Sequence, residues 1–323
     1  MKGSVLVTGA AGFAGSHLLE LLLQERGVKI TAWRRPKPKA RLKADFTPAG
    51  AADDTIVWDD VDILDREAVF AAAARAQPSI VFHCAGAAHV GQAWNDVEST
   101  LAINVRGTHH LLDALERTSS GRVRVVIPGS ALVYKPSDQA LTEASPLVPS
   151  GPYGLSKLAQ EKLGLAARDA RIETVVARAF NHFGPRQDPA FAASGFARQI
   201  AAIERGLQEP VIRVGNLEAR RDLTDVRDTV RAYAALAEQG LSGEVYNVCS
   251  GRAVPIGDLL HMLLSRARTR VRTEIDPTRL RPSDVPVLLG DPSRIRNATG
   301  WTADTPLERT IEDVLTYWRE VAL

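Results

Sequence analysis

Short apolar runs alternate with longer segments of helical spacing along residues 1–180. The apolar runs predict strands at residues 4–7, 29–33, 55–58, 80–82, 123–127 and 172–177. The longer segments predict helices at residues 13–26, 67–76, 97–118 and 153–168. Because the strand runs lack polar alternation, helices are expected to cover both faces of the sheet. The order predicts an α/β fold, a Rossmann-like doubly wound parallel sheet.

The pattern changes after Arg178. The later segments predict helices at 196–205, 225–238 and 306–320, a strand at 244–248, and a Pro- and Arg-rich connection at 276–292. We therefore expect a sheet domain built from residues 1–179 and 222–249. A smaller, mostly helical C-terminal substrate lobe is expected from residues 180–221 and 250–323. A ligand cleft is expected between the two.

Composition narrows the class of protein. The 323 residues carry 40 Lys and Arg against 38 Asp and Glu, a net charge of +2, which argues against a nucleic-acid-binding protein. No run of 18 apolar residues and no secretory signal is found, so a cytoplasmic protein with no membrane partner is expected. The two cysteines, Cys84 and Cys249, each lie in an apolar run, and a reducing compartment fits them best.

A glycine-rich turn separates the first predicted strand from the first predicted helix. Its residues include Gly9, Gly12, Phe13, Ala14 and Gly15. Glycine lets the backbone approach a pyrophosphate closely, and a helix N-terminus offers free N–H groups to it. These five residues therefore predict a phosphate loop for a dinucleotide cofactor. The alternative is a glycine-rich turn without a ligand.

The end of the second predicted strand bears on the choice of cofactor. Arg34 and Arg35 stand where an acidic residue would bind the ribose hydroxyls of NAD, and residues 34–43 contain six basic residues and no acid. Guanidinium groups suit a 2′-phosphate, so NADP(H) is predicted, with NAD(H) possible. The alternative is a solvated basic loop. Asp62 and Ile63 follow the third strand and are placed to meet the adenine, although Asp62 could instead cap the next helix.

A tyrosine and a lysine four residues apart, Tyr153 and Lys157, begin a predicted helix and share one of its faces. A nearby ammonium favours the phenolate and is expected to lower the tyrosine pKa from its usual value of about 10. Ser130 follows the strand at 123–127, at the carboxyl edge where open α/β sheets bind ligands. The three residues predict an acid–base centre, the alternative being an ordinary helix tyrosine.

With these motifs in order, the whole chain resembles an extended short-chain dehydrogenase/reductase of the nucleotide-sugar type (NAD-dependent epimerase/dehydratase family). The family pattern is matched by the glycine loop, Asn104, Ser130, Tyr153 and Lys157. Three later stretches resemble the branch of GDP-mannose 4,6-dehydratases and GDP-6-deoxy-4-keto-mannose reductases. They cover residues 179–185, 215–222 and 281–292.

The resemblance implies roles for individual residues. Tyr153 would exchange the proton, Lys157 would tune it and hold the nicotinamide ribose, and Ser130 would hydrogen-bond the sugar oxygen. Further cofactor contacts are implied for Ala85 and Asn104. For the nucleotide sugar, His89 and Ser130 are implied to contact the sugar, Asp284 the ribose, and three residues the diphosphate, namely Asn181, Arg221 and Arg281. For Arg281 an ion pair between the lobes is the alternative, and for His89 a loop position without a role. No metal site is predicted.

One position departs from the dehydratase pattern. Dehydratases of this group carry a glutamate two residues after the hydroxyl residue, and it removes the proton that elimination of water requires. Here that position is Leu132, and its neighbour Ala131 is also not acidic. Dehydration is therefore disfavoured. A reductase or an epimerase needs only the tyrosine, the lysine and a hydride carrier.

The leading hypothesis is an NADPH-dependent reductase of a nucleotide-linked 4-keto-6-deoxy sugar, most plausibly GDP-linked. A nucleotide-sugar epimerase with bound NAD(P) is the alternative. A third hypothesis, from outside the enzymes, is a catalytically silent dinucleotide-sensing or scaffold protein with this fold. The resemblance also implies a homodimer formed through the helices at 97–118 and 153–168. An apolar stripe on the first helix could serve that contact or face the sheet. It consists of Leu101, Val105, His109, Leu112 and Leu115.

Overall fold

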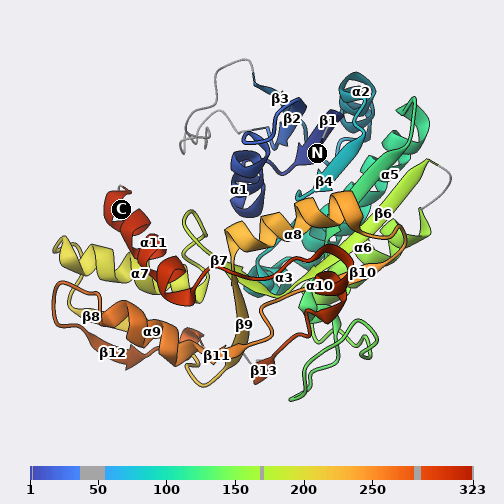
Figure 1. Ribbon diagram of the computed structural model, residues 1–323. Helices are drawn as coiled ribbons and strands as arrows, with labels where there is room; N and C mark the ends of the chain where they lie inside the picture. Colours follow the sequence, from blue (N-terminus) through green and yellow to red (C-terminus); the bar gives the residue numbers. More distant parts are fainter. Residues whose placement is uncertain (2, 37–54, 168–170, 280–284, 322–323) are drawn as a thin grey trace.

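A computed structural model describes residues 1, 3–36, 55–167, 171–279 and 285–321. Its centre is a seven-stranded sheet in the order β10-β6-β5-β4-β1-β2-β3 (Figure 1). The strands are β1 (Gly3–Thr8), β2 (Val28–Arg34), β3 (Ile56–Asp60), β4 (Ile80–His83), β5 (Val123–Pro128), β6 (Ile172–Ala179) and β10 (Val245–Val248). All neighbouring strands are parallel. The order reverses between β1 and β4, as in a doubly wound sheet, and confirms the predicted fold class.

Helices cover both faces of this sheet. They are α1 (Phe13–Leu22), α2 (Arg66–Ala76), α3 (Val90–Asn95), α4 (Val97–Leu101), α5 (Gly107–Thr118), α6 (Pro152–Ala166) and α8 (Val226–Gln239). Successive residues of β1 point to opposite faces. Val5 and Val7 pack with α1 and α8, whereas Leu6 packs with α2 and α5. The central strands are therefore apolar without alternation because both of their faces are buried.

The C-terminal part of the chain forms a second apolar cluster, whose helices and strands lie at the left of Figure 1. It joins α7 (Ala192–Glu204), β8 (Val211–Val214), α9 (Ile256–Leu264) and α11 (Leu307–Glu320), and β12 (Arg272–Ile275) pairs with β8. A small sheet contains β7 (Asn181–Phe183), β9 (Arg220–Asp225), β11 (Ala253–Pro255) and β13 (Val287–Leu288). The short elements are η2 (Ala131–Val133), η3 (Pro277–Arg279) and α10 (Ser293–Thr299). On this basis we propose the two-part division at the boundaries given above, with residue 222 falling inside β9.

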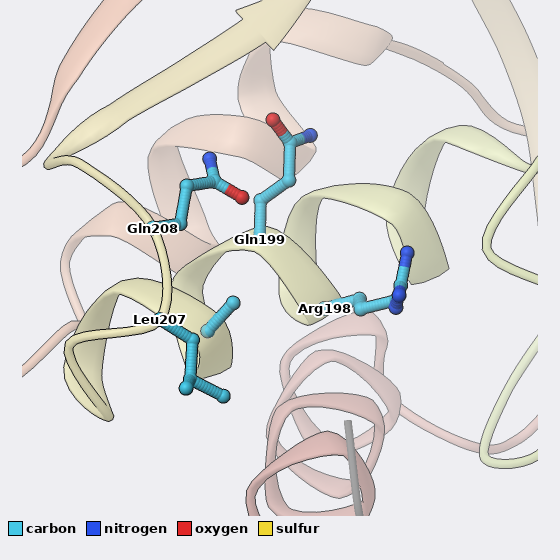
Figure 2. Close-up of a pocket in the computed structure, with 5 residues that line it drawn as sticks. Arg198, Gln199, Leu207 and Gln208 are labelled. Carbon is cyan, nitrogen blue, oxygen red and sulfur yellow. The ribbon is translucent and has the colours of Figure 1, made fainter.

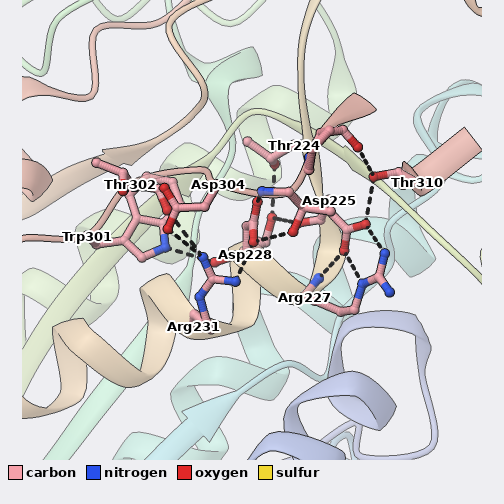
Figure 3. A network of polar contacts seen from close by, with 12 residues as sticks. Thr224, Asp225, Arg227, Asp228, Arg231, Trp301, Thr302, Asp304 and Thr310 are labelled. Carbon is pink, nitrogen blue, oxygen red and sulfur yellow. Dashed lines mark hydrogen bonds and ion pairs between the residues drawn. The ribbon is translucent and has the colours of Figure 1, made fainter. Parts of the chain in front are cut away.

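A buried polar network joins the start of α8 to the C-terminal segments (Figure 3). Asp225 caps α8 and accepts a hydrogen bond of 2.7 Å from Thr310 of α11. Asp228 accepts hydrogen bonds of 2.8 Å from both the backbone N–H and the hydroxyl of Thr305. The Trp301 indole donates to the Asp228 carbonyl at 2.9 Å. The network holds α11 against the strand and helix that lead back into the main sheet.

The predicted helix at 97–118 has the predicted ends, but it is not a regular α-helix throughout. A π-helical turn, η1 (Ala102–Arg106), separates α4 from α5 and contains Asn104. The extra residue shifts the phase of the helix, so the predicted stripe does not form one face. Leu112 and Leu115 pack between α2 and the sheet, whereas His109 is exposed. The α1 helix also ends at Leu22, before the predicted residue 26.

The structure also bears on the expectations about membrane spans, metal sites and the two cysteines. Within the described ranges, no helix combines the length and the apolar character needed to cross a membrane. The same ranges contain no group of three or more His, Cys, Asp or Glu side chains arranged to hold a metal ion. Both cysteines are free thiols, with Cys249 buried and Cys84 partly buried.

Candidate active site

The glycine loop forms a backbone cradle that side chains would fill. Gly9 has φ +64°, and a Cβ at this position would lie 2.6 Å from the backbone nitrogen of Ala85. A Cβ on Gly15 would overlap the carbonyl oxygen of Gly9. Gly12 is the N-cap of α1, so no side chain caps the helix, and its first turn holds no acidic residue. The cradle and the open helix N-terminus fit the diphosphate of a dinucleotide.

A polar clamp holds α1 in place on the side away from the glycine loop. Arg186 donates two hydrogen bonds to the Glu20 carboxylate, at 2.9 and 2.8 Å. His17 contacts the Pro185 carbonyl at 2.9 Å. Burial raises the pKa of Glu20, but hydrogen bonds from His17 and Arg186 lower it more strongly, to about 2. The helix that presents the phosphate cradle is therefore anchored to the segment after β7.

At the end of β2, Arg34 is paired rather than solitary. Its Nε donates to Oδ1 of Asp60 at 2.6 Å, and its guanidinium lies over the ring of Trp58, 5.4 Å from the centroid. Arg35, the next residue, is exposed. The sequence reading missed Asp60, although the parallel register that aligns Arg34 with Asp60 follows from pairing the second and third strands. The other bases of the run, Lys37, Lys39, Arg41 and Lys43, lie outside the described residues.

The two residues predicted to meet the adenine occupy the turn after β3. Asp62 accepts a hydrogen bond of 2.9 Å from the backbone N–H of Leu64. The N-cap of α2 is Asp65, so the alternative in which Asp62 caps this helix is wrong. Ile63 is buried, and a Cβ on Gly107 would come within 2.8 Å of its side chain. Ile63 thus packs directly on α5, and contact with an adenine stays a prediction.

Ser130 and Tyr153 come together at the carboxyl edge of the sheet. Ser130 is buried two residues beyond β5, and its Oγ accepts from the backbone N–H of Leu132 at 3.2 Å. Tyr153 lies in the first turn of α6. Burial raises the pKa of Tyr153, and the hydrogen bond with Ser130 acts in the opposite direction. The pKa is therefore shifted upward in this structure, opposite to the lowering expected from the sequence.

Lys157 lies on the same helix and is buried. Its Nζ donates to the Pro128 carbonyl at 2.5 Å and to Oε1 of Gln160. Burial lowers the pKa of Lys157 to about 8, while the nearby Cys84 and Glu161 act in the opposite direction. The ammonium form still predominates at pH 7, so Lys157 brings a positive charge to the helix that carries Tyr153.

Asn104 and Ala85 shape the wall beneath the glycine loop. Asn104 is fully buried, and its side chain accepts from the N–H of Ala87 at 2.8 Å and donates to the Ala87 carbonyl at 3.2 Å. It also donates to Oγ of Ser156 at 2.9 Å. The N–H of Ala85 donates to Oγ1 of Thr8 at 3.1 Å. Asn104 thus joins the loop after β4 to α6 and, in this structure, its side-chain amide binds protein groups.

His89 was predicted to touch the sugar, and Asn181 to hold the nucleotide diphosphate. His89 is the N-cap residue of α3, and its ring stacks on Phe191 with centroids 5.1 Å apart. Its Nε2 lies 3.9 Å from Oδ2 of Asp188. Asn181 begins β7 and is exposed. His89 therefore bridges the loop after β4 and the segment leading into α7. Its contact with the sugar and the contact of Asn181 with the diphosphate stay predictions.

Arg221 was predicted to bind the substrate diphosphate together with Arg281. Its Nη1 donates to the carbonyls of Val285 at 2.7 Å and of Arg220 at 2.9 Å. Arg281 and Asp284 lie outside the described residues, so neither the diphosphate contact nor the alternative ion pair is tested. Arg221 therefore anchors the chain at Val285, just before β13.

The loop between Ser130 and Tyr134 packs closely against α6. A Cβ on Gly154 would overlap the carbonyl oxygen of Leu132. Leu132 lies in η2, directly beside the serine, and residues 129–135 contain no Asp or Glu. No carboxylate of this loop can therefore act as a base beside the hydroxyls of Ser130 and Tyr153.

A separate hollow lies on the C-terminal lobe (Figure 2). Its volume is about 350 Å³, and it is lined by Arg198, Gln199, Ala202, Leu207 and Gln208. It lies along α7 and the segment leading to β8, and none of the predicted site residues lines it. It is therefore distinct from the carboxyl edge of the sheet, where the hydroxyl pair and Lys157 lie.

Three comparisons place this geometry among known proteins. Residues 6–314 match the family model described as GDP-mannose 4,6 dehydratase. The chain is 31% identical, over 98% of both chains, to a GDP-6-deoxy-D-mannose reductase of Pseudomonas aeruginosa. The RMD protein of that organism, solved in complex with NADPH, superposes with a TM-score of 0.83 at 29% identity, over 98% of this chain and 99% of that one.

A UDP-glucose 4-epimerase of Thermus thermophilus, solved with NAD, superposes with a TM-score of 0.84 at 26% identity, over 98% of this chain and 99% of that one. A protein solved with NADPH and an epimerase solved with NAD therefore share this architecture over nearly the whole chain. The glycine cradle, the seven-stranded sheet and the matched family model agree with one another. The chain belongs to the GDP-mannose 4,6-dehydratase-like family of NAD(P)-dependent enzymes, within the extended short-chain dehydrogenases/reductases.

Proposed function

We propose that the protein is an NADPH-dependent reductase of a GDP-linked 4-keto-6-deoxy sugar. The observation that carries the proposal is the pair of hydroxyls at the sheet edge, Ser130 and Tyr153, beside a loop without a carboxylate. Reduction of a ketone needs a proton donor at the carbonyl oxygen, whereas dehydration also needs a base for the neighbouring carbon. The similarity to the reductase of Pseudomonas aeruginosa supports the same choice.

Tyr153, Ser130 and Lys157 each have a separate role in the proposed reduction of the ketone. Tyr153 donates its phenolic proton to the C4 oxygen of the sugar, and its raised pKa keeps the phenol protonated at neutral pH beforehand. Ser130 holds the same oxygen by a hydrogen bond. Lys157 carries positive charge beside them and stabilises the phenolate that remains, which solvent then reprotonates. When bound at the glycine cradle, NADPH supplies the hydride that C4 receives.

Gly9, Gly12 and Gly15 would hold the cofactor diphosphate, and Arg34 with Arg35 would meet the 2′-phosphate. For the substrate, we propose His89, Asn181, Arg221, Arg281 and Asp284 as contacts to the nucleotide sugar. A guanidinium suits a diphosphate because it offers paired donors. We also propose a homodimer, which size measurement in solution would test.

The test is a panel of GDP-, dTDP-, UDP- and CDP-linked 4-keto-6-deoxy sugars, each with NADPH and with NADH. NADPH should be oxidised fastest with the GDP-linked ketone, and the product should be the 6-deoxy sugar with a hydroxyl at C4. Tyr153→Phe should abolish turnover, while NADPH binding, measured by fluorescence, persists. Turnover by Tyr153→Phe at the wild-type rate, or no reduction of any ketone in the panel, would contradict the proposal.

A nucleotide-sugar epimerase is the second candidate, and one observation favours it. Asp60 binds Arg34 and so competes with a 2′-phosphate for the guanidinium. A cofactor lacking that phosphate suits the pair better, and the structurally similar UDP-glucose 4-epimerase was solved with NAD. An epimerase would interconvert GDP- or UDP-sugars without net change in NAD(P)H absorbance, which separates it from the reductase in the same panel.

A further inference from the structure

A continuous chain of buried polar side chains leads away from Lys157 into the protein interior. Lys157 donates to Oε1 of Gln160, and Nε2 of Gln160 donates to Oγ1 of Thr108 at 2.8 Å. The hydroxyl of Thr108 donates in turn to the carbonyl of Asn104 at 2.7 Å. Gln160 and Thr108 are fully buried, so water cannot replace these partners.

The chain continues through the centre of the sheet to the glycine loop. Nε2 of His83, in β4, lies 2.9 Å from Oγ1 of Thr108. Nδ1 of His83 lies 2.8 Å from Oγ1 of Thr8, at the end of β1. Thr8 precedes Gly9, and its hydroxyl oxygen accepts from the N–H of Ala85 at 3.1 Å. The Lys157 chain, defined as Lys157, Gln160, Thr108, His83 and Thr8, therefore joins the catalytic helix to the cofactor cradle.

The donors and acceptors in this chain allow one consistent assignment. Thr108 gives its proton to the Asn104 carbonyl, so its oxygen accepts from Gln160 and from Nε2–H of His83. Nδ1 of His83 then accepts the Thr8 hydroxyl proton. His83 is neutral in this arrangement, and burial, reinforced by the charge of Lys157, lowers its pKa to about 3. The ring therefore links two hydroxyls in a single fixed tautomer.

At the other end of the Lys157 chain lies the ammonium group itself. An ammonium has three N–H donors, and two of those of Lys157 are held by Pro128 and Gln160. Cys84 and Glu161 face the ammonium. The Cys84 thiol is neutral, because burial raises its pKa to about 12, and Glu161 is already paired with Arg178 at 2.7 Å. Gln160 is therefore the neutral side chain that both touches the ammonium and is itself held.

We propose that Gln160, Thr108 and His83 are positioning residues that hold the Lys157 ammonium in its working orientation. This inference rests on the proposed function for its catalytic consequence, since Lys157 acts there beside Tyr153. None of the three residues needs to touch substrate or cofactor. They act by presenting a fixed acceptor, Oε1 of Gln160, which leaves one ammonium N–H for the reaction.

The first test compares Thr108→Val with Thr108→Ser. Valine keeps the shape and removes the hydroxyl, whereas serine keeps the hydroxyl. Lysine labelled with ¹³C at Cε gives few signals, because the chain has eight lysines, and Lys157→Arg assigns the relevant one. In Thr108→Val the Lys157 pKa should fall by about one unit, because the ammonium loses its fixed acceptor. In Thr108→Ser it should stay at the wild-type value.

An unchanged Lys157 pKa in Thr108→Val would overturn the proposal, whatever the activity of the variant. If Thr108→Val does not fold, Gln160→Met takes its place, since methionine has similar length without the amide, and the same fall in pKa is expected. A second spectrum, of ¹⁵N-labelled histidine, reads the tautomer of His83 among the seven histidines. Protonation at Nδ1, or titration of His83 between pH 5 and pH 8, would equally overturn the proposal.

Activity is the third measurement, and it separates this proposal from the proposed function. With the GDP-linked ketone, kcat should fall about tenfold in Thr108→Val with little change in KM. Thr108→Ser should keep the wild-type kcat. If the wild type reduces no nucleotide sugar, the proposed function fails, but the two spectra still decide whether the chain holds Lys157. An equal loss of kcat in both variants would assign Thr108 a packing role and refute positioning.

Discussion

Removing Arg178, the buried arginine that pairs with Glu161 of α6, should be among the most destabilising single changes in the protein. Arg178, in β6, donates to the carboxylate of Glu161 at 2.8 and 2.7 Å, and to the Tyr134 hydroxyl at 2.8 Å. The two charged side chains are only 3% and 1% exposed. Arg178→Met leaves the Glu161 carboxylate buried without the guanidinium that pairs with it.

The magnitude follows from that burial. Breaking one partner of a buried pair costs about 3–5 kcal/mol, because the remaining charge stays out of water uncompensated. Replacing both partners with well-packed apolar residues of similar volume costs far less and is often neutral or even stabilising. The double variant Arg178→Met/Glu161→Met should therefore be more stable than either single variant. The coupling between the two sites would amount to several kcal/mol.

The assay is urea unfolding followed by fluorescence, with the wild type, both single variants and the double variant compared at one pH. The m-value should remain constant, so that shifts in midpoint report stability. Arg178→Met within about 1 kcal/mol of the wild type would refute the reasoning, because it would mean that Glu161 reaches solvent or another donor. Additive losses in the double variant would refute the claim that the two side chains stabilise the protein as a pair.

Three further predictions concern the cofactor side of the molecule. Gly15→Ala should abolish NADPH binding in a fluorescence titration because its Cβ has no room, whereas Gly121→Ala, with open space around it, should bind normally. Asp60→Asn removes the carboxylate that competes for Arg34 and should tighten NADPH binding about two- to fivefold, with the affinity for NADH unchanged in parallel titrations. Glu20 has a folded pKa of about 2 against 4.5, so its contribution is present above pH 4.5 and is lost as the pH falls toward 2. Because Glu20 is partly exposed, Glu20→Gln should cost only about 1 kcal/mol at pH 7, and its stability should change less between pH 4.5 and pH 2 than that of the wild type.

Much of the fold could be read from the chain because the signals were local and agreed with one another. Apolar runs bounded by glycine and polar residues marked the strands, and parallel strands bring their carboxyl ends to one edge. The placement of Ser130 near Tyr153 follows from that rule together with the helix that begins at Pro152. The pairing of Arg34 with Asp60 could have been found by the same rule, since both residues end neighbouring strands.

Other features depend on contacts that no local pattern encodes. The pKa of Tyr153 is raised by burial, against a hydrogen bond with Ser130, and burial cannot be read from the four-residue spacing of Tyr153 and Lys157. Arg221 is drawn to backbone carbonyls because β13 pairs with β9 across a long sequence separation. The roles of His83 and Thr108 likewise arise only when β4, α5 and α6 are packed together.

The π-helical turn at Ala102–Arg106 limits how this stretch of chain can change in length. Such a turn is an α-helix carrying one additional residue. Deleting a single residue there would rotate α5 by about 100° relative to α4. Either Asn104 would then lose Ala87 and Ser156, or Leu111 would leave the core. A one-residue gap at this point in an alignment would therefore mark a relative whose loop after β4 is built differently.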